Sequence, residues 1–166
     1  MSGTMMDTKT KEKLAGMIAD ISVAMLTTVA SDGTLRSRPM ACPKHGYDGD
    51  LWFFTSDDAP KVLELAESTR ANVAFAEPKD ERYVSISGRL MLVHDPARAK
   101  ELWTPLLKGW FPGGLEDPHL ALLRVAVEQV EYWDAKLSRM HLYFSLAKSA
   151  LTGRPPKHAG EHQRFG

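Results

Sequence analysis

Two short stretches of this sequence carry side chains suited to binding an anion. The first is the run Arg36-Ser37-Arg38-Pro39-Met40, in which two arginines are separated by one residue. On a β-strand such residues point to the same face, so the two guanidinium groups repel each other unless an anion or a pair of carboxylates lies between them. The competing interpretation is a solvated outer face, where charged strand residues usually lie.

The second stretch is Phe54-Thr55-Ser56 followed by Lys61, which places two hydroxyls and a lysine where a strand passes into a helix. The intervening residues Asp57, Asp58 and Pro60 are typical of the first turn of a helix. A helix N-terminus offers unpaired N–H groups, which suit a phosphate. Simple capping by Thr55 and Ser56 is the alternative. Together the two stretches favour a phosphate site.

The elements that must position these residues follow from hydrophobic periodicity and turn residues. Pro39 predicts an edge or a bulge, and Gly88 predicts a bulge or a close approach between strands. The expected strands cover residues 22–29, 34–42, 51–55, 72–76, 83–93 and 122–133. The expected helices cover residues 11–21, about 57–69, a segment beginning at 95–96, and 139–151.

This order of elements predicts an α+β fold, a small antiparallel split β-barrel with flanking helices and with its strands in meander order. The turns between the first three strands are too short for the crossovers of a parallel sheet. Residues 1–10 are expected to be a disordered leader, residues 11–153 the single domain, and residues 154–166 a flexible tail.

The composition is that of an ordinary globular domain, with 43% apolar and 25% charged residues in 166. Basic and acidic residues balance at 21 each, so nothing favours nucleic acid or a membrane surface as a partner. The one cysteine, Cys42, fits a reducing compartment, and no segment is an expected membrane span or signal peptide, which predicts a cytoplasmic protein. His158 and His162 are four residues apart, but Gly160 between them argues against a helical metal site.

Several motifs give the chain its resemblance to a known family. They occur in that family's order along nearly the whole chain: SRPM at 37–40, LWFFTS at 51–56 with Lys61, YVSISG at 83–88, WFPGG at 110–114 with Glu116-Asp117-Pro118, EYWD at 131–134 and LTG at 151–153. The sequence resembles the pyridoxamine-phosphate-oxidase-like flavoproteins, specifically their small general stress protein branch.

The resemblance implies a split-barrel homodimer that binds FMN at the subunit interface. It implies that Arg38, Lys61, Thr55 and Ser56 contact the FMN phosphate, with Arg36 and Ser37 beside them. It also implies that the backbone at Pro39 and Met40 lies along the isoalloxazine ring and that Phe54 shapes the pocket. Trp110 and Phe111 are the candidates for a contribution from the second subunit.

The resemblance further implies an FMN-dependent oxidoreductase in which the cofactor supplies the redox chemistry, so no catalytic residue is assigned. A true pyridoxamine phosphate oxidase is not expected, because Arg154, Lys157 and Arg164 lie in a Pro/Gly/His tail that does not match the substrate-phosphate site of those enzymes. A flavin-binding stress protein without turnover is the alternative function. A deazaflavin or haem is the alternative ligand.

Overall fold

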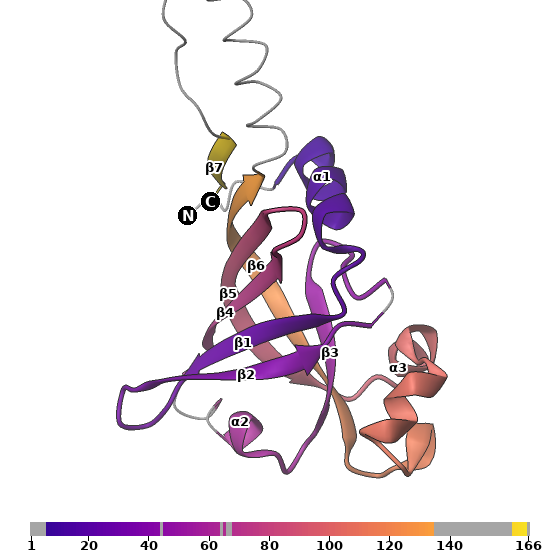
Figure 1. Ribbon diagram of the computed structural model, residues 1–166. Coiled ribbons are helices and arrows are strands. Elements are labelled where there is room, and N and C mark those ends of the chain that lie inside the picture. Colours follow the sequence, from indigo (N-terminus) through magenta and orange to yellow (C-terminus); the bar gives the residue numbers. More distant parts are fainter. Residues whose placement is uncertain (1–5, 44, 64, 66–67, 135–160, 166) are drawn as a thin grey trace, which may run out of the picture.

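Six antiparallel strands form a curled sheet with helices at its end and side (Figure 1). The computed structural model describes residues 6–43, 45–63, 65, 68–134 and 161–165. The strands of the curled sheet are β1 (Val23–Val29), β2 (Leu35–Ala41), β3 (Leu51–Ser56), β4 (Arg70–Glu77), β5 (Arg82–Val93) and β6 (Leu120–Asp134), in the spatial order β2-β1-β4-β5-β6-β3. The helices are α1 (Thr8–Ile18), α2 (Pro60–Leu63) and α3 (Pro96–Leu102), with 3₁₀ turns at η2 (Pro105–Gly109) and η3 (Gly114–Glu116).

The barrel is split between β2 and β3, the two strands at the ends of that order. The expected α+β split barrel is therefore confirmed, but the meander order is wrong at β3. This strand follows β2 in sequence, yet it pairs with β6, with Leu51 opposite Val125. The connection from Cys42 to Asp50 is too long to act as a tight hairpin that would force β3 onto β2. Both stretches with site residues thus lie at the split.

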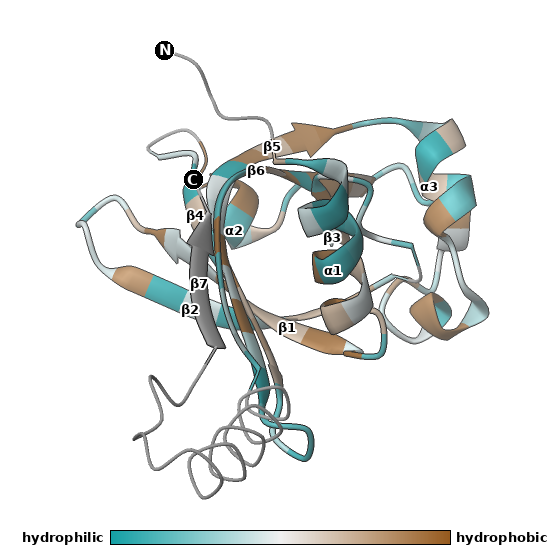
Figure 2. Ribbon diagram, turned by 90° about the horizontal axis from the view of Figure 1, so that it is seen from above, coloured by the Kyte–Doolittle hydropathy of each residue, from teal (hydrophilic) through white to brown (hydrophobic). Residues whose placement is uncertain are grey.

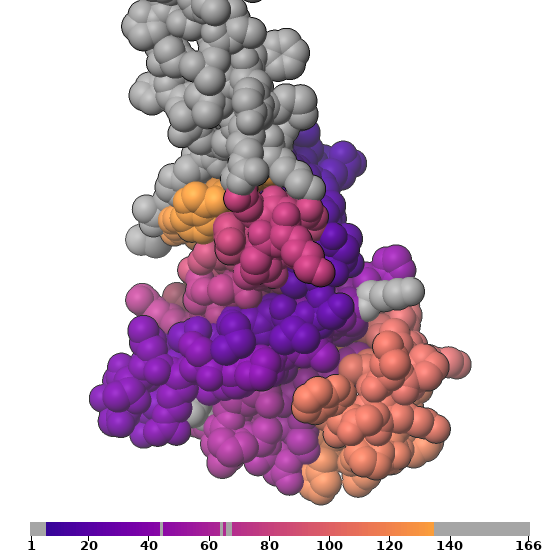
Figure 3. Space-filling view, in the orientation of Figure 1, coloured from indigo at the N-terminus to yellow at the C-terminus, as the bar shows by residue number. Residues whose placement is uncertain are grey.

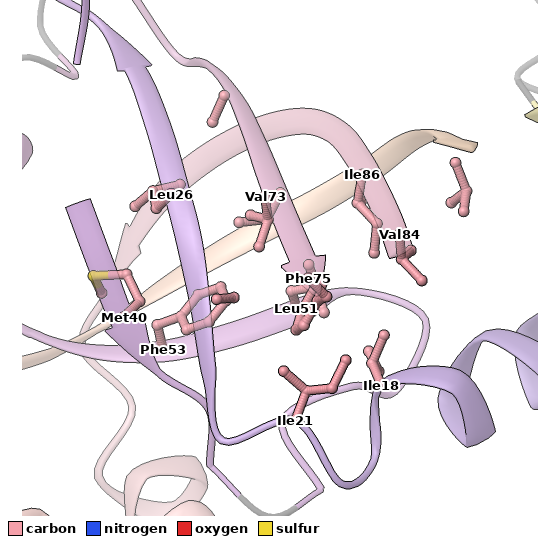
Figure 4. Close-up of a cluster of buried hydrophobic side chains, with 14 of the residues drawn as sticks. Ile18, Ile21, Leu26, Met40, Leu51, Phe53, Val73, Phe75, Val84 and Ile86 are labelled. Atoms are coloured by element: carbon pink, nitrogen blue, oxygen red, sulfur yellow. The ribbon is translucent and has the colours of Figure 1, made fainter. Parts of the chain in front are cut away.

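The main core fills the barrel interior, where alternate residues of each strand point inward (Figure 4). Leu26, Val73, Ile86 and Phe53 are among the fully buried members of this cluster. Helix α1 closes one end of the barrel by adding Leu14, Met17 and Ile18 to the same core, as the view from above shows (Figure 2).

A second hydrophobic cluster lies on the outer side of β3, beneath α3 and η2. Phe54, Leu102, Leu107 and Leu122 are its main buried members, with Trp103 and Phe111 packed against them. Strand β3 therefore has two buried faces, because Phe53 points into the barrel and Phe54 into this cluster. In the space-filling view the segment from α3 to η3 forms a lobe beside β1 and β2 (Figure 3).

Several element boundaries differ from those expected. Helix α1 begins at Thr8, where the Asp7 side chain accepts a hydrogen bond from the Thr10 N–H at 2.7 Å, so residues 8–10 do not belong to a leader. Helix α2 ends at Leu63, and residues 68–69 are not helical. The expected tail contains a seventh strand, β7 (Glu161–Phe165), which pairs with the end of β6. The expected helix at 139–151 lies outside the described residues.

Pro39 and Gly88 have the roles that their residue types predict. Pro39 lies on β2, an edge strand, where a missing N–H removes no necessary ladder bond. Gly88 lies where the register between β5 and β6 shifts, and a Cβ atom there would come within 2.1 Å of the Ala126 carbonyl oxygen. The close approach at this bulge leaves no room for a side chain.

Gly88→Ala is therefore expected to lower the free energy of unfolding by about 2–3 kcal/mol, because β5 and β6 must separate to admit the methyl group. The measurement is urea denaturation followed by circular dichroism. Gly16→Ala in α1 is the control: its Cβ would meet nothing within 4 Å, and the same change should add about 0.5–1 kcal/mol through helix propensity. Equal stability of the two variants would contradict the close approach at Gly88.

Candidate functional site

The inner face of β2 presents Arg36, Arg38 and Met40 in a row. Arg38 is paired with Leu26 of β1, whose side chain is fully buried inside the barrel, and Met40 belongs to the barrel core. Arg36 is exposed at the outer end of the row, opposite Thr28. The prediction that the two arginines share a face is confirmed. They lie where the barrel interior opens at the split.

Arg38 is held on this face by the neighbouring strand. Its Nη1 donates to the Thr28 hydroxyl and to the Leu26 carbonyl oxygen, the latter at 3.5 Å. Thr28 is only 2% exposed, so this hydrogen bond anchors the guanidinium to a rigid part of the sheet. The anchoring fixes the direction in which the rest of the guanidinium points.

Ser37 and Pro39 point to the opposite, outer face of the sheet. The Ser37 hydroxyl is 2.7 Å from that of Thr27, and Pro39 is opposite Met25. The side chain of Ser37 is therefore on the other side of β2 from the two arginines.

The two hydroxyls at the end of β3 bond within their own segment. Thr55 is 1% exposed and donates to the Ser56 carbonyl oxygen at 3.2 Å. The Ser56 hydroxyl donates to an Asp58 carboxylate oxygen at 2.6 Å. In both bonds the hydroxyl is the donor, which is not the acceptor role of a helix N-cap, so these bonds do not support the capping interpretation. A phosphate would have to displace them in order to use either hydroxyl.

Lys61 lies on α2, which is too short for its dipole to attract an anion strongly, so charged side chains dominate this region. The ammonium group is half-buried, and no carboxylate among the described residues pairs with it. Burial lowers the pKa of Lys61, and the nearby positive charge of Arg38 lowers it further. Lys61 on α2 thus lies within electrostatic range of Arg38 on β2.

The three aromatic residues of the predicted site have different surroundings. Phe54 is buried in the second cluster, with its ring centroid 5.5 Å from that of Trp103 and 6.2 Å from that of Phe111. Phe111 thus packs within its own chain. Trp110, the next residue, is 74% exposed and projects from the lobe formed by α3 and the 3₁₀ turns.

Two features of the site did not enter the sequence prediction. Thr28 was interpreted only as a β-branched strand residue, although it anchors Arg38. Asp57, expected to be part of a helix start, has its carboxylate between His94 and His119 instead. The inward alternation of β1 could have indicated Thr28, but the histidines are distant in sequence and left no signal.

Comparisons with known proteins show the family to which this fold belongs. The family model described as pyridoxamine 5'-phosphate oxidase like matches residues 9–157. The chain belongs to this family. The chain is also 32% identical to the general stress FMN/FAD binding protein from Xanthomonas citri, whose crystal structure aligns with a TM-score of 0.65 over 77% of this chain and 90% of that one.

Two further relatives match more of the chain. A crystal structure of a general stress protein 26 from Jannaschia sp. aligns with a TM-score of 0.72 over 96% of this chain and 99% of that one, at 22% identity. Protein bli-3 from Neurospora crassa is 26% identical over 159 residues, which are 90% of this chain and 76% of that protein. These likenesses extend the shared fold to nearly the whole chain. Over the described part of the chain, every helix falls short of the length and apolar character needed to cross a membrane.

Thr28→Val is expected to lower the free energy of unfolding by about 1–2 kcal/mol, because it removes a buried acceptor from the Arg38 guanidinium while keeping the side-chain volume. Thr27→Val is the matched control, since Thr27 bonds to Ser37 on the exposed outer face. Chemical denaturation of both variants measures the difference. An equal decrease in the free energy of unfolding of the two variants would mean that the Thr28 hydroxyl does not anchor Arg38.

Proposed function

We propose that this protein is an FMN-binding flavoprotein and an FMN-dependent oxidoreductase associated with the general stress response. The observation that carries the proposal is that Arg38 on β2 and Lys61 on α2, the helix that follows β3, come from the two edges of the split and lie near enough for the charge of Arg38 to lower the pKa of Lys61. Like charges near each other are unfavourable, and a phosphate bound between them offsets that cost. Family membership and the FMN/FAD-binding relative from Xanthomonas citri support a flavin as the source of that phosphate.

The residues at the split fit the phosphate end of FMN. Arg38 can present a planar guanidinium with its position fixed by Thr28, and Lys61 adds a second charge from the other side. Because burial and Arg38 lower the pKa of Lys61, a bound phosphate would raise it again and favour the charged ammonium. Arg36 lies one step further out on the same face, where it adds positive charge near the opening.

The free edge of β2 is where we propose that the isoalloxazine ring of FMN lies. An edge strand leaves every second residue with its backbone groups facing away from its neighbour, and on β2 these residues include Ser37, Pro39 and Ala41. Pro39 therefore offers a carbonyl oxygen but no N–H, and Ser37 and Ala41 offer the N–H donors on either side of it. Backbone groups beside an isoalloxazine ring can orient it and tune its electronics, while bound FMN would supply hydride or electron transfer. The protein then binds, orients and shields the cofactor, and we assign no catalytic side chain.

We further propose that the protein is a homodimer with the flavin at its interface. The outer face of the sheet exposes apolar side chains: Val23 at 52% and Met25 at 42% lie on β1 beside β2, and Tyr83 at 41% and Trp133 at 39% are paired on β5 and β6. Met25 has Pro39 on one side and Ala74 on the other, so the apolar surface is continuous across three strands. Covering this face with a second copy would enclose the ring site. Trp110, exposed on its lobe, is the side chain we propose the second subunit contributes.

A cytoplasmic location also belongs to this proposal. Cys42 is a free thiol, and burial raises its pKa to about 11, so it remains protonated at neutral pH. A single protonated thiol in a protein that uses a redox cofactor suits a reducing compartment.

The first experiment measures FMN and riboflavin affinity by fluorescence quenching. Lys61→Ala should weaken FMN binding by about 1.5–3 kcal/mol, or about 10- to 150-fold in Kd, and leave riboflavin binding nearly unchanged, because riboflavin lacks the phosphate. Lys79→Ala, on an exposed loop, is the charge-matched control. If Lys61→Ala binds FMN as tightly as the wild type, Lys61 does not contact the phosphate. If the wild-type protein shows no flavin absorbance after incubation with FMN and desalting, the proposal that FMN is the cofactor is wrong. Binding of a deazaflavin or haem instead of FMN would also contradict the proposal that FMN is the cofactor.

The second experiment tests the interface. Met25→Glu should convert the dimer to a monomer and release flavin, because a charge would be buried at the centre of the apolar face. Met91→Glu, a change of the same type on β5 at 38% exposure, is the control and should remain dimeric. Light scattering coupled to size exclusion, with flavin absorbance recorded, gives both results. A monomeric wild type that holds flavin would refute the shared site.

A further inference from the structure

The Asp57 carboxylate lies between two imidazole rings. Its Oδ1 is 2.9 Å from His119 Nδ1, and its Oδ2 is 3.2 Å from His94 Nε2. The backbone adds a third link, because the Asp57 N–H donates to the His119 carbonyl oxygen at 2.9 Å. We call Asp57, His94 and His119 the histidine clasp.

The three residues of the clasp come from three separate connections. Asp57 follows β3, His94 follows β5, and His119 immediately precedes β6. The residue after His94 is Asp95, the N-cap of α3, so the clasp also reaches the lobe of the second cluster. If the contacts of Asp57 were broken, the segment between β3 and α2 would lose its links to both His94 and His119.

That segment is the one that carries Lys61. Between the clasp and Lys61 the chain is short and internally bonded: Ser56 donates to Asp58, the Ala59 N–H donates to the Ser56 carbonyl oxygen at 3.1 Å, and α2 begins at Pro60. A displacement at Asp57 is therefore transmitted to Lys61. We propose that the histidine clasp positions the Lys61 segment and makes its anion affinity depend on pH, an inference that rests on the proposed function.

Protonation strengthens the clasp. The Asp57 carboxylate raises the pKa of His119, with smaller contributions from Asp58 and Asp117, and His119 in turn lowers the pKa of Asp57, with His94 acting in the same direction. A raised histidine pKa means that the ionic form of the clasp is fully present below about pH 6.5 and is lost as pH rises through the raised value. The lowered pKa of Asp57 means that acid disrupts the clasp only below the ordinary aspartate range.

Other charged groups border the clasp. A cavity of about 480 Å³ beside His94 is lined by Asp95, Lys100, Glu116 and Asp117, among mostly apolar residues. Carboxylates thus outnumber cations around the clasp, and two of them, Asp58 and Asp117, add to the effect of Asp57 on His119. The His94 and His119 rings bind different oxygens of the Asp57 carboxylate. In the described part of the chain, no group of three or more His, Cys, Asp or Glu side chains is arranged to hold a metal ion.

The test compares wild type with His119→Asn, whose amide can replace the Nδ1 hydrogen bond but cannot titrate. FMN dissociation constants are measured from pH 5.5 to 8.5 for both proteins. At pH 5.5–6 the wild type should bind FMN roughly two- to fivefold more tightly than the variant, and the two should converge by pH 8.5. The titration of the FMN phosphate itself affects both proteins equally.

A second readout does not depend on flavin. NMR titration of the full chain should give His119 a pKa above 6.5, and Asp57→Asn should return it toward that value. Amide exchange across Ser56–Lys61 should slow as pH falls below the His119 pKa, after correction for intrinsic rates. The inference is wrong if the ratio of the FMN dissociation constants of wild type and His119→Asn does not vary with pH. It is also wrong if the pKa of His119 is the same in Asp57→Asn as in the wild type. If the protein binds no FMN at any pH, the proposed function is wrong. The pKa of His119 and the amide exchange rates then still show whether the clasp orders the Lys61 segment.

Discussion

The repulsion between Arg38 and Lys61 is the interaction around which the rest of the structure is arranged. Burial and the positive charge of Arg38 both disfavour the charged form of Lys61, so the scaffold must hold the two side chains near each other by other means. Arg38 is fixed by Thr28 on β1, a strand paired on both sides. Lys61 is fixed through the segment that follows β3, whose position depends on pairing with β6 and on the contacts of Asp57.

The sheet order explains why these two groups meet. A simple meander would pair β2 with β3 and close the space between them with backbone hydrogen bonds. Because β3 pairs with β6 instead, β2 and β3 remain the two edges of a curled sheet, and the gap between them is lined by side chains. The burial of Phe53 on one face of β3 and Phe54 on the other keeps that edge rigid. An incomplete barrel with two firm edges is thus what creates the site.

The local features of the fold could be predicted from the sequence because they depend on local physics. The two-residue period of β2 placed Arg36 and Arg38 on one face, and Pro39 indicated an edge strand. The partner of β3 could not be predicted, since it depends on which long-range pairing buries Phe53 and Phe54 together. The length of α2 was overestimated because the apolar residues after Pro60 continue at helical spacing. The histidine clasp joins three distant loops, which no periodicity reveals.

The length of β6 has a consequence for how the chain folds. At 15 residues, this strand pairs with β5, β3 and β7, and β3 is the partner most distant in sequence. Pairings that close large loops carry a high entropic cost and form late, after local hairpins such as β1–β2 and β4–β5. The second edge of the split is therefore completed near the end of folding. A chain leaving the ribosome would acquire its two hairpins first and its anion site only after β6 has been synthesised.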